Sequence, residues 1–183
     1  MHVRASIFGL LAGLMTQSVS ATTLERLSLD TMVGKSTAIV RARVIGTSAE
    51  TRNGSIYTRY TLQVSETWKG AIGTKVEVSV PGGTLNGLRQ TVPGAPVLDS
   101  SDDLVLFLWK GSSGRFQVIG LSQGLFYVNR DDSGVAMIER PGVKELMIDG
   151  QTGRAVQDVT VRMPLGEMKT RVVTKVAEMQ AGN

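Results

Sequence analysis

Cysteine is absent from this chain of 183 residues, and its one histidine is His2. Without cysteine the chain has no disulfide, no thiol nucleophile and no thiolate ligand for a metal ion. Without a histidine beyond position 2 it lacks Ser-His-Asp and Cys-His catalysis, and it lacks imidazole ligands for zinc or haem. Paired carboxylates or a Ser–Lys pair are the hydrolytic chemistries that remain. We therefore expect a protein that is not an enzyme and that has no cofactor and no bound metal ion.

Long apolar runs are also scarce, and the one extended run, Ala5–Met15, lies near the start of the chain. It follows Arg4, is shorter than the roughly 20 residues of a membrane-spanning helix, and precedes Val19-Ser20-Ala21, the small residues that a signal peptidase recognises. The cleavage point has no cysteine, which excludes a lipid anchor. Residues 1–21 therefore predict a signal peptide and an exported protein, periplasmic or extracellular, without a membrane span. The mature chain is expected to begin within about two residues of Thr22.

Charge of one sign is not concentrated in any segment. The formal net charge is +4, from 20 Lys and Arg against 16 Asp and Glu, and it falls to +3 when Arg4 leaves with the signal. Because the charges are interspersed, we expect no affinity for nucleic acid or for a membrane surface. Removing 21 residues from 183 leaves 162, a size that fits one domain, 22–183, with a core large enough to fold without disulfides.

Two acidic clusters resemble known functional motifs. Asp99, Asp102 and Asp103 stand directly before an apolar segment. They could form a loose calcium site with oxygen ligands, but a solvated turn explains them more simply. Asp132-Ser133-Gly134 matches the triplet of aspartic proteases, yet it occurs once and follows polar residues, which favours a hairpin turn. Neither cluster changes the expectation that the protein is not an enzyme.

The first part of the mature chain changes from a helical to a strand pattern. A short helix is predicted over about 24–34, since apolar residues recur there at helical intervals, Thr22 and Glu25 have capping-box spacing, and Gly34 can end it. Apolar and polar residues then alternate, which predicts strands over 38–45, 56–65 and 76–80. A polar loop is expected between the first two strands, over 47–55.

The second half of the chain has the pattern of short strands and turns. Glycine and proline indicate a long loop over 81–103, with one short strand near 88–92. Leu104–Trp109 is apolar on both faces, which predicts a central strand, and 115–119 is expected to be the next strand. Hairpins are predicted within 125–139 and 143–156, and Pro164 opens a C-terminal helix. Many short strands separated by turns indicate a barrel or a sandwich.

Two of the predicted strands resemble a known family. Ile39–Thr47 looks like the first strand of the tissue inhibitors of metalloproteinases, and Ile56–Val64 with Trp68-Lys69-Gly70 looks like their second. The chain is also similar to bacterial exported proteins that have a segment like Gly124–Val128. The inhibitors are netrin-type modules, so the resemblance implies a mostly β fold built on a five-stranded OB-type barrel, over about 37–140. A short N-terminal helix, extra β-hairpins, and a C-terminal hairpin and helix over about 141–180 would complete it.

The resemblance also implies a function and a site. In these inhibitors the free amino group and first carbonyl chelate the zinc ion of the protease, and a Thr or Ser at the second position points into its specificity pocket. Thr22 and Thr23 would occupy those positions here, which would make a secreted zinc metalloprotease the partner. The family pins its N-terminus with disulfides from the first and third residues, and Thr22 and Leu24 cannot form them.

A second candidate site lies on the strands themselves. Alternation places Tyr60, Leu62 and Val64 in the core and Arg41, Arg43 and Arg59 on the opposite, exposed face, with Tyr57 beside them. These arginines could bind an anionic glycan or single-stranded nucleic acid, or they could form a solvated face paired with Glu66 or Glu77. Two hypotheses follow: an inhibitor or escort of a co-secreted metalloprotease, or a structural or adhesive envelope module that binds glycan or a surface protein.

Overall fold

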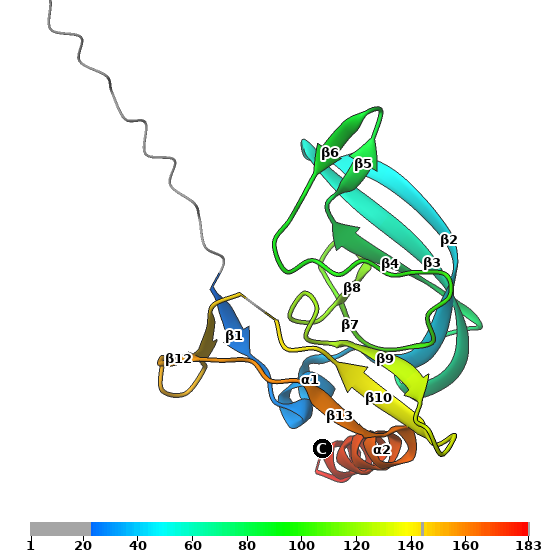
Figure 1. Cartoon of the computed structure of the whole chain (residues 1–183), viewed down its shortest axis with the longest axis vertical. Helices are drawn as coiled ribbons and strands as arrows, with labels where there is room; N and C mark the ends of the chain where they lie inside the picture. The colour runs from blue at the N-terminus through cyan, green and yellow to red at the C-terminus, as the bar shows by residue number, and fades with distance from the viewer. Residues whose placement is uncertain (1–22, 144, 183) are drawn as a thin grey trace, which may run out of the picture.

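A computed structural model describes residues 23–143 and 145–182 of the chain (Figure 1). The predicted signal peptide, 1–21, and Thr22 lie outside these residues. The fold is mostly β, with helices α1 (Leu29–Lys35) and α2 (Leu165–Ala181). The strands of this part of the chain are β1 (Leu24–Arg26), β2 (Ala38–Arg52), β3 (Ser55–Lys69), β4 (Lys75–Pro81), β5 (Gly83–Leu85), β6 (Leu88–Gln90), β7 (Leu104–Lys110), β8 (Phe116–Val118), β9 (Leu125–Arg130), β10 (Ala136–Arg140), β11 (Met147–Asp149), β12 (Ala155–Val156) and β13 (Val161–Pro164).

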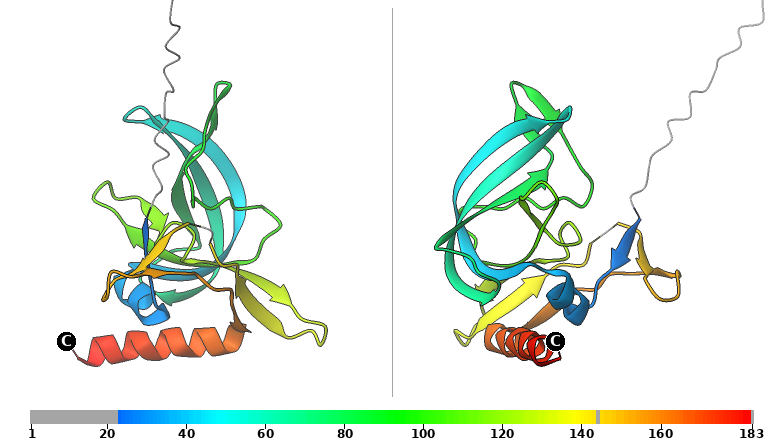
Figure 2. Two further views of the ribbon diagram at one scale, coloured as in Figure 1. Left: turned by 60° about the vertical axis from the view of Figure 1, so that its left-hand side comes forward. Right: turned by 180° about the vertical axis from the view of Figure 1, so that it is seen from behind.

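The largest sheet contains eight strands in the order β13-β10-β9-β7-β2-β3-β4-β8. Its last strand, β8, is parallel to β4 through one residue pair and antiparallel to β7 over three pairs. The sheet is strongly curved, as the views in Figures 1 and 2 show. A small sheet, β1-β11-β12, lies to one side of it, and β5 and β6 form a separate hairpin.

The N-terminal segment is a strand followed by a helix, so the predicted helix over 24–34 is wrong in its first half. Leu24–Arg26 pairs in parallel with Met147–Asp149. The helix begins only after Ser28, whose Oγ accepts a hydrogen bond from the backbone N–H of Thr31 at 3.1 Å. Tertiary pairing therefore overrides the local helical spacing, and Ser28 takes the capping role that the sequence assigned to Thr22.

Strands β2 and β3 form one long hairpin, which corrects the polar loop predicted over 47–55. Each strand has 15 residues, and they pair as far as Arg52 and Ser55. The connection is the two-residue turn Asn53-Gly54, in which both residues have positive φ, 50° and 77°. Asn-Gly is the sequence that two-residue hairpin turns of this twist favour. The polar residues before it belong to the exposed end of the strand.

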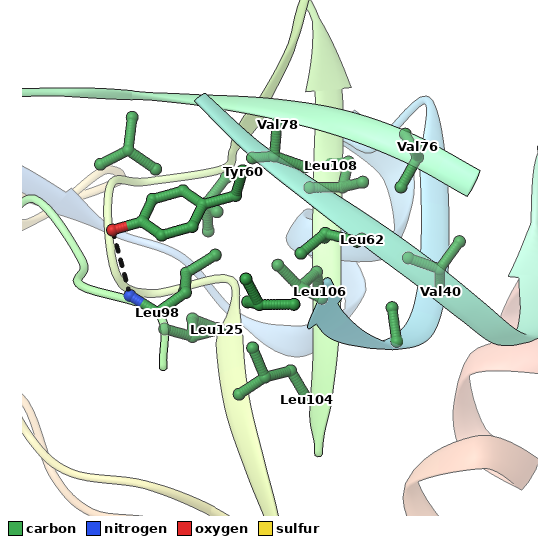
Figure 3. Close-up of a cluster of buried hydrophobic side chains, with 14 of the residues drawn as sticks. Val40, Tyr60, Leu62, Val76, Val78, Leu98, Leu104, Leu106, Leu108 and Leu125 are labelled. Atoms are coloured by element: carbon green, nitrogen blue, oxygen red, sulfur yellow. Dashed lines mark hydrogen bonds between the residues drawn. The ribbon is translucent and has the colours of Figure 1, made fainter. Parts of the chain in front are cut away.

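The inner face of the curved sheet holds one apolar cluster (Figure 3). The alternation predicted for the strands is confirmed: Leu62 is 0% exposed and Tyr60 is 6% exposed. The Tyr60 hydroxyl accepts a hydrogen bond from the backbone N–H of Leu98 at 3.4 Å, which ties the 91–103 segment to this core. Val64, predicted to be buried, is half-buried and lies beside the register shift between Arg41 and Ala42.

A second apolar cluster lies on the outer face, beneath the two helices. Leu104–Leu108 is completely buried, because its alternate residues belong to the two clusters, and the predicted central strand is confirmed. Helix α2 begins after Pro164, as predicted, and lies next to β10 and β13 (Figure 2). Its Met168 and Val172 are buried, while Met179 is 36% exposed. The helices therefore cover one side of the sheet near its β13 edge.

Candidate functional site

The predicted partner-binding N-terminus leads into a strand that is held in place. Thr23 is the first residue that the structure describes, and it is exposed. The backbone N–H of Leu24 donates to the carbonyl of Leu146 at 3.0 Å, and β1 continues parallel to β11. The chain is thus fixed from Leu24 onward on one side, without any disulfide.

Gln123 holds the other side of the same segment. Its side chain is buried; Oε1 accepts from the backbone N–H of Leu27 at 2.9 Å, and Nε2 donates to the carbonyl of Glu25 at 2.9 Å. The turn that carries it is tight, since Gly120 and Leu121 both have a φ of 60°. One side chain therefore satisfies a donor and an acceptor of the N-terminal backbone, as a neighbouring strand would. The sequence gives no local sign of this contact.

An open hollow of about 410 Å³ lies beside the N-terminal strand. Leu24, Leu27 and Ile119 give it apolar walls, and Lys35 and Glu25, 3.7 Å apart, lie at its edge. Trp109, near the end of β7, also lines it and is 39% exposed. An exposed tryptophan next to an apolar hollow is typical of protein–protein contact sites.

Arg41 is half-buried in an ion-pair network, not exposed as predicted. Its Nε and Nη2 donate to the two carboxylate oxygens of Asp103, at 3.1 and 2.7 Å, and its Nη1 donates to Glu66 at 2.9 Å. Hydrogen bonds to Asp103, and then to Glu66, raise the pKa of Arg41 above its already high ordinary value. With its donors occupied in this way, Arg41 is tied to two carboxylates of its own chain.

Glu66 extends this network to helix α2. It accepts from Lys169 Nζ at 2.7 Å and from the Trp68 indole at 3.1 Å. The hydrogen bond from Lys169, with those from Trp68 and Arg41, lowers the pKa of Glu66 to about 2, against the opposing effect of burial. The pairing of Arg41 with Glu66 agrees with the solvated-face interpretation, and Lys169 is a partner that the sequence did not indicate.

The other two predicted arginines are more exposed and do not act as one patch with Arg41. Arg43 lies 3.5 Å from Asp103 Oδ2, and its side chain is 64% exposed. Arg59 lies 3.8 Å from Glu77 and donates to Ser48 Oγ at 3.3 Å, with 40% of its side chain exposed. The structure thus joins Arg41 and Arg43 at Asp103 and gives Arg59 separate partners. Tyr57, expected beside them, lies under the guanidinium of Arg52.

A polar pocket of about 250 Å³ opens next to Arg43. Besides Arg41, Asp102 and Asp103, it is lined by residues that sequence reasoning missed, namely Tyr127, Asn129 and Arg130. Burial, and to a smaller extent the charge of Asp102, raises the pKa of the Tyr127 hydroxyl. These residues come from β9, which lies next to β7 in the sheet but follows β8 in the chain. An anionic group could contact Arg43 and Arg130 here.

The acidic clusters have structural roles in their turns. Asp99 accepts from the backbone and hydroxyl of Ser101, at 2.9 Å each, and Asp131 in the same way binds Ser133. The predicted hairpin turn around Asp132-Ser133-Gly134 is confirmed, since it joins β9 and β10. Within 23–143 and 145–182 no group of three or more His, Cys, Asp or Glu could hold a metal ion. In the same residues no helix is long and apolar enough to cross a membrane.

No family model matches the chain, and no curated protein matches it either. The resemblance of Ile39–Thr47 and Ile56–Val64 to strands of the tissue inhibitors of metalloproteinases stays a prediction.

Proposed function

We propose that the chain is an exported protein-binding module built on a five-stranded OB-type barrel. The strand pairings form a ring that begins and ends at β7: β7–β2, β2–β3, β3–β4, β4–β8 and β8–β7. In this ring β8 is parallel to β4. Fifteen buried residues of these strands and their neighbours fill the inside. The order of the five strands around this ring differs from their order in the chain, and they surround an apolar centre. This arrangement fits an OB barrel, a fold that binds its ligands through its faces and loops.

The observation that carries the proposal is the fixed N-terminal strand. Ordering a free terminus costs about 1–2 kcal/mol per residue, and the tissue inhibitors of metalloproteinases, which two strands of this chain resemble, avoid this cost with disulfides. Here β11 and Gln123 hold Leu24–Leu27 through hydrogen bonds on two sides. Thr23 directly precedes this segment and is exposed. Thr23 is thereby attached to a rigid segment, as a binding wedge would require.

The partner that this arrangement suits best is a secreted zinc metalloprotease. A cleaved chain would begin with the α-amino group of Thr22, whose ordinary pKa of about 7.7–8.0 leaves a neutral fraction that can coordinate zinc. Thr23 would carry its hydroxyl towards the substrate pocket. The hollow lined by Trp109 lies beside the strand Leu24–Arg26 and would bury apolar surface of the protease. Inhibition or escort by binding would follow, without catalysis by the chain itself.

An alanine added before Thr22 tests this mechanism. One residue moves the amino group about 3.5 Å, too far for a zinc–nitrogen bond of about 2 Å. We expect the exported protein to inhibit a co-secreted zinc protease, and the extended variant to lose inhibition while its melting temperature is unchanged. Trp109→Ala is the matched second variant and should weaken inhibition without abolishing it. Equal inhibition by the extended and native proteins would contradict the N-terminal mechanism.

A second candidate function is supported by the polar pocket beside Arg43. In that case the chain is a structural or adhesive envelope module that recognises an anionic glycan or a surface protein through Arg43 and Arg130. Both side chains are exposed and line the pocket, whereas Arg41 is occupied by Asp103 and Glu66. Binding to a sulfated polysaccharide, lost in Arg43→Ala and Arg130→Ala but unchanged by the alanine extension, would favour this function over inhibition.

A further inference from the structure

A cavity of about 290 Å³ lies where the N-terminal segment, α1, β10 and α2 meet; of the residues that line the hollow beside Trp109, it shares Leu27. Its deep walls are apolar. Met32, Phe126 and Met168 are almost completely buried, and Met163 is half-buried. Methionine side chains are flexible and polarisable, so a cavity that they line can adapt to an apolar guest. The volume is at the lower end of the range for ligand pockets, which limits the guest to a small molecule.

Three arginines line the same cavity: Arg26 at the end of β1, Arg140 in β10 and Arg171 in α2. Arg26 and Arg171 are exposed at its mouth, and Arg140 is buried in its wall. One acidic residue, Asp149, also lines it. The Asp149 carboxylate accepts from the backbone and hydroxyl of Thr152, and those hydrogen bonds lower its pKa. The side chains of the lining therefore carry three positive charges and one negative charge.

The partners of these arginines leave donors for a ligand. Arg140 binds Asp158 through both terminal nitrogens, but its Nε–H is buried and has no hydrogen-bond partner. Arg171 pairs with Glu167 one helical turn away. Because both side chains are about half exposed, this ion pair contributes little to stability, and a ligand carboxylate can replace Glu167 as the partner of Arg171. No ion pair joins Arg26 to another residue of the described part of the chain within 4.0 Å.

We propose that this cavity binds a small amphiphilic carboxylate, namely a linear alkanoate of medium length. The alkyl chain would lie among Met32, Phe126 and Met168, and the carboxylate would lie at the mouth, where Arg26 and Arg171 present charged donors. Guanidinium groups match the planar geometry of a carboxylate, and the apolar walls favour an unbranched tail over a polar anion. This proposal does not depend on the inhibitory function, because the site does not include Thr22, Thr23 or Trp109.

Titration with sodium octanoate, followed by NMR of ¹³C-methyl-labelled methionines, tests the proposal on the exported protein. We expect the methyl signals of Met32, Met163 and Met168 to shift, and those of Met137 and Met179, which do not line the cavity, to remain. Across hexanoate, heptanoate and octanoate the affinity should rise about fourfold per methylene, the gain expected from burying each one.

Variants at the mouth of the cavity separate the contribution of the arginine charges to binding from the contribution of the apolar walls. Arg26→Ala with Arg171→Ala should weaken octanoate binding at least tenfold, while Arg154→Ala, an exposed arginine outside the cavity, should leave it unchanged. Val159→Trp, at an exposed lining position, should block binding without loss of fold. Octanol binding as tightly as octanoate, the arginine variants binding normally, or shifts of Met137 and Met179 alone would each overturn the proposal.

Discussion

The side chain of Gln123 donates to the backbone carbonyl of Glu25, 98 residues earlier in the chain, at 2.9 Å. Its other amide atom accepts from Leu27 at the same distance. A buried amide with both hydrogen bonds directed at the backbone of one segment, Glu25–Leu27, acts as a substitute for a neighbouring strand. This contact, together with β11, is the reason that the N-terminal segment has a defined position in a protein without disulfides.

Gln123→Leu removes this support while keeping most of the side-chain volume. The Leu27 N–H and the Glu25 carbonyl lose their partner in a part-buried setting, so we expect the free energy of unfolding to fall by about 1–3 kcal/mol. Amide exchange of Leu27 should become faster, whereas that of Leu62 in the core should change only with global stability. Gln151→Leu, at an exposed position in the β11–β12 turn, is the control. Unchanged exchange at Leu27 would show that the hydrogen bonds do not hold the segment.

The two faces of β3 predict which of two substitutions lowers the stability in urea denaturation more. Leu62→Ala leaves a cavity at a position that is 0% exposed and should destabilise the protein by about 2–5 kcal/mol. Arg59→Ala removes an exposed side chain with a 3.8 Å ion pair, and its cost should be below about 1 kcal/mol. The opposite ranking would mean that the faces of the strand are inverted.

Glu66 should give the protein part of its acid sensitivity. The pKa of its carboxyl is about 2 in the folded protein, lowered from an ordinary 4.5, chiefly by the hydrogen bond from Lys169. A lowered carboxyl pKa stabilises the fold above pH 4.5, and this contribution is lost as the pH falls towards 2. Because the side chain is 28% exposed and partly screened, we expect an effect on the order of 1 kcal/mol.

Unfolding measured between pH 5 and pH 2 tests this contribution. Glu66→Gln should lose less stability than the wild type over that interval, since it has no carboxylate to protonate there. Glu77→Gln is the matched control. The ion pair between Glu77 and Arg59 is exposed and 3.8 Å long, so this variant should lose about as much stability as the wild type between pH 5 and pH 2. Identical curves for Glu66→Gln and the wild type would rule out the assigned role.

Processing of the chain is testable by intact mass. The exported protein should begin within about two residues of Thr22, because Val19-Ser20-Ala21 fits the signal peptidase rule. Val19→Leu with Ala21→Leu should slow cleavage, since bulky residues do not fit that rule. A secreted species that retains 1–21 would contradict both the export prediction and the use of the Thr22 amino group.

Much of the site could not be found from sequence patterns. The sequence predicts that Asp103 is part of a solvated turn, yet it is the main partner of Arg41, 62 residues away. A usable signal exists, since Asp103 directly precedes a strand buried on both faces and thus lies at the end of a central strand. No comparable signal indicates Gln123 or Lys169, whose partners are brought to them only by the packing of a turn and a helix.

The sequence by itself determined the alternation that buries Leu62 and the two-face burial of Leu104–Leu108. It also determined the helix after Pro164. Each of these depends on the spacing of apolar residues within a few positions, which is a local property. Only the tertiary structure decided that Leu24–Arg26 is a strand, because its partner, Met147–Asp149, lies near the other end of the chain. It also decided the cavity lined by Arg26, Arg140 and Arg171, since residues of three separate elements meet there through long-range packing that no local pattern encodes.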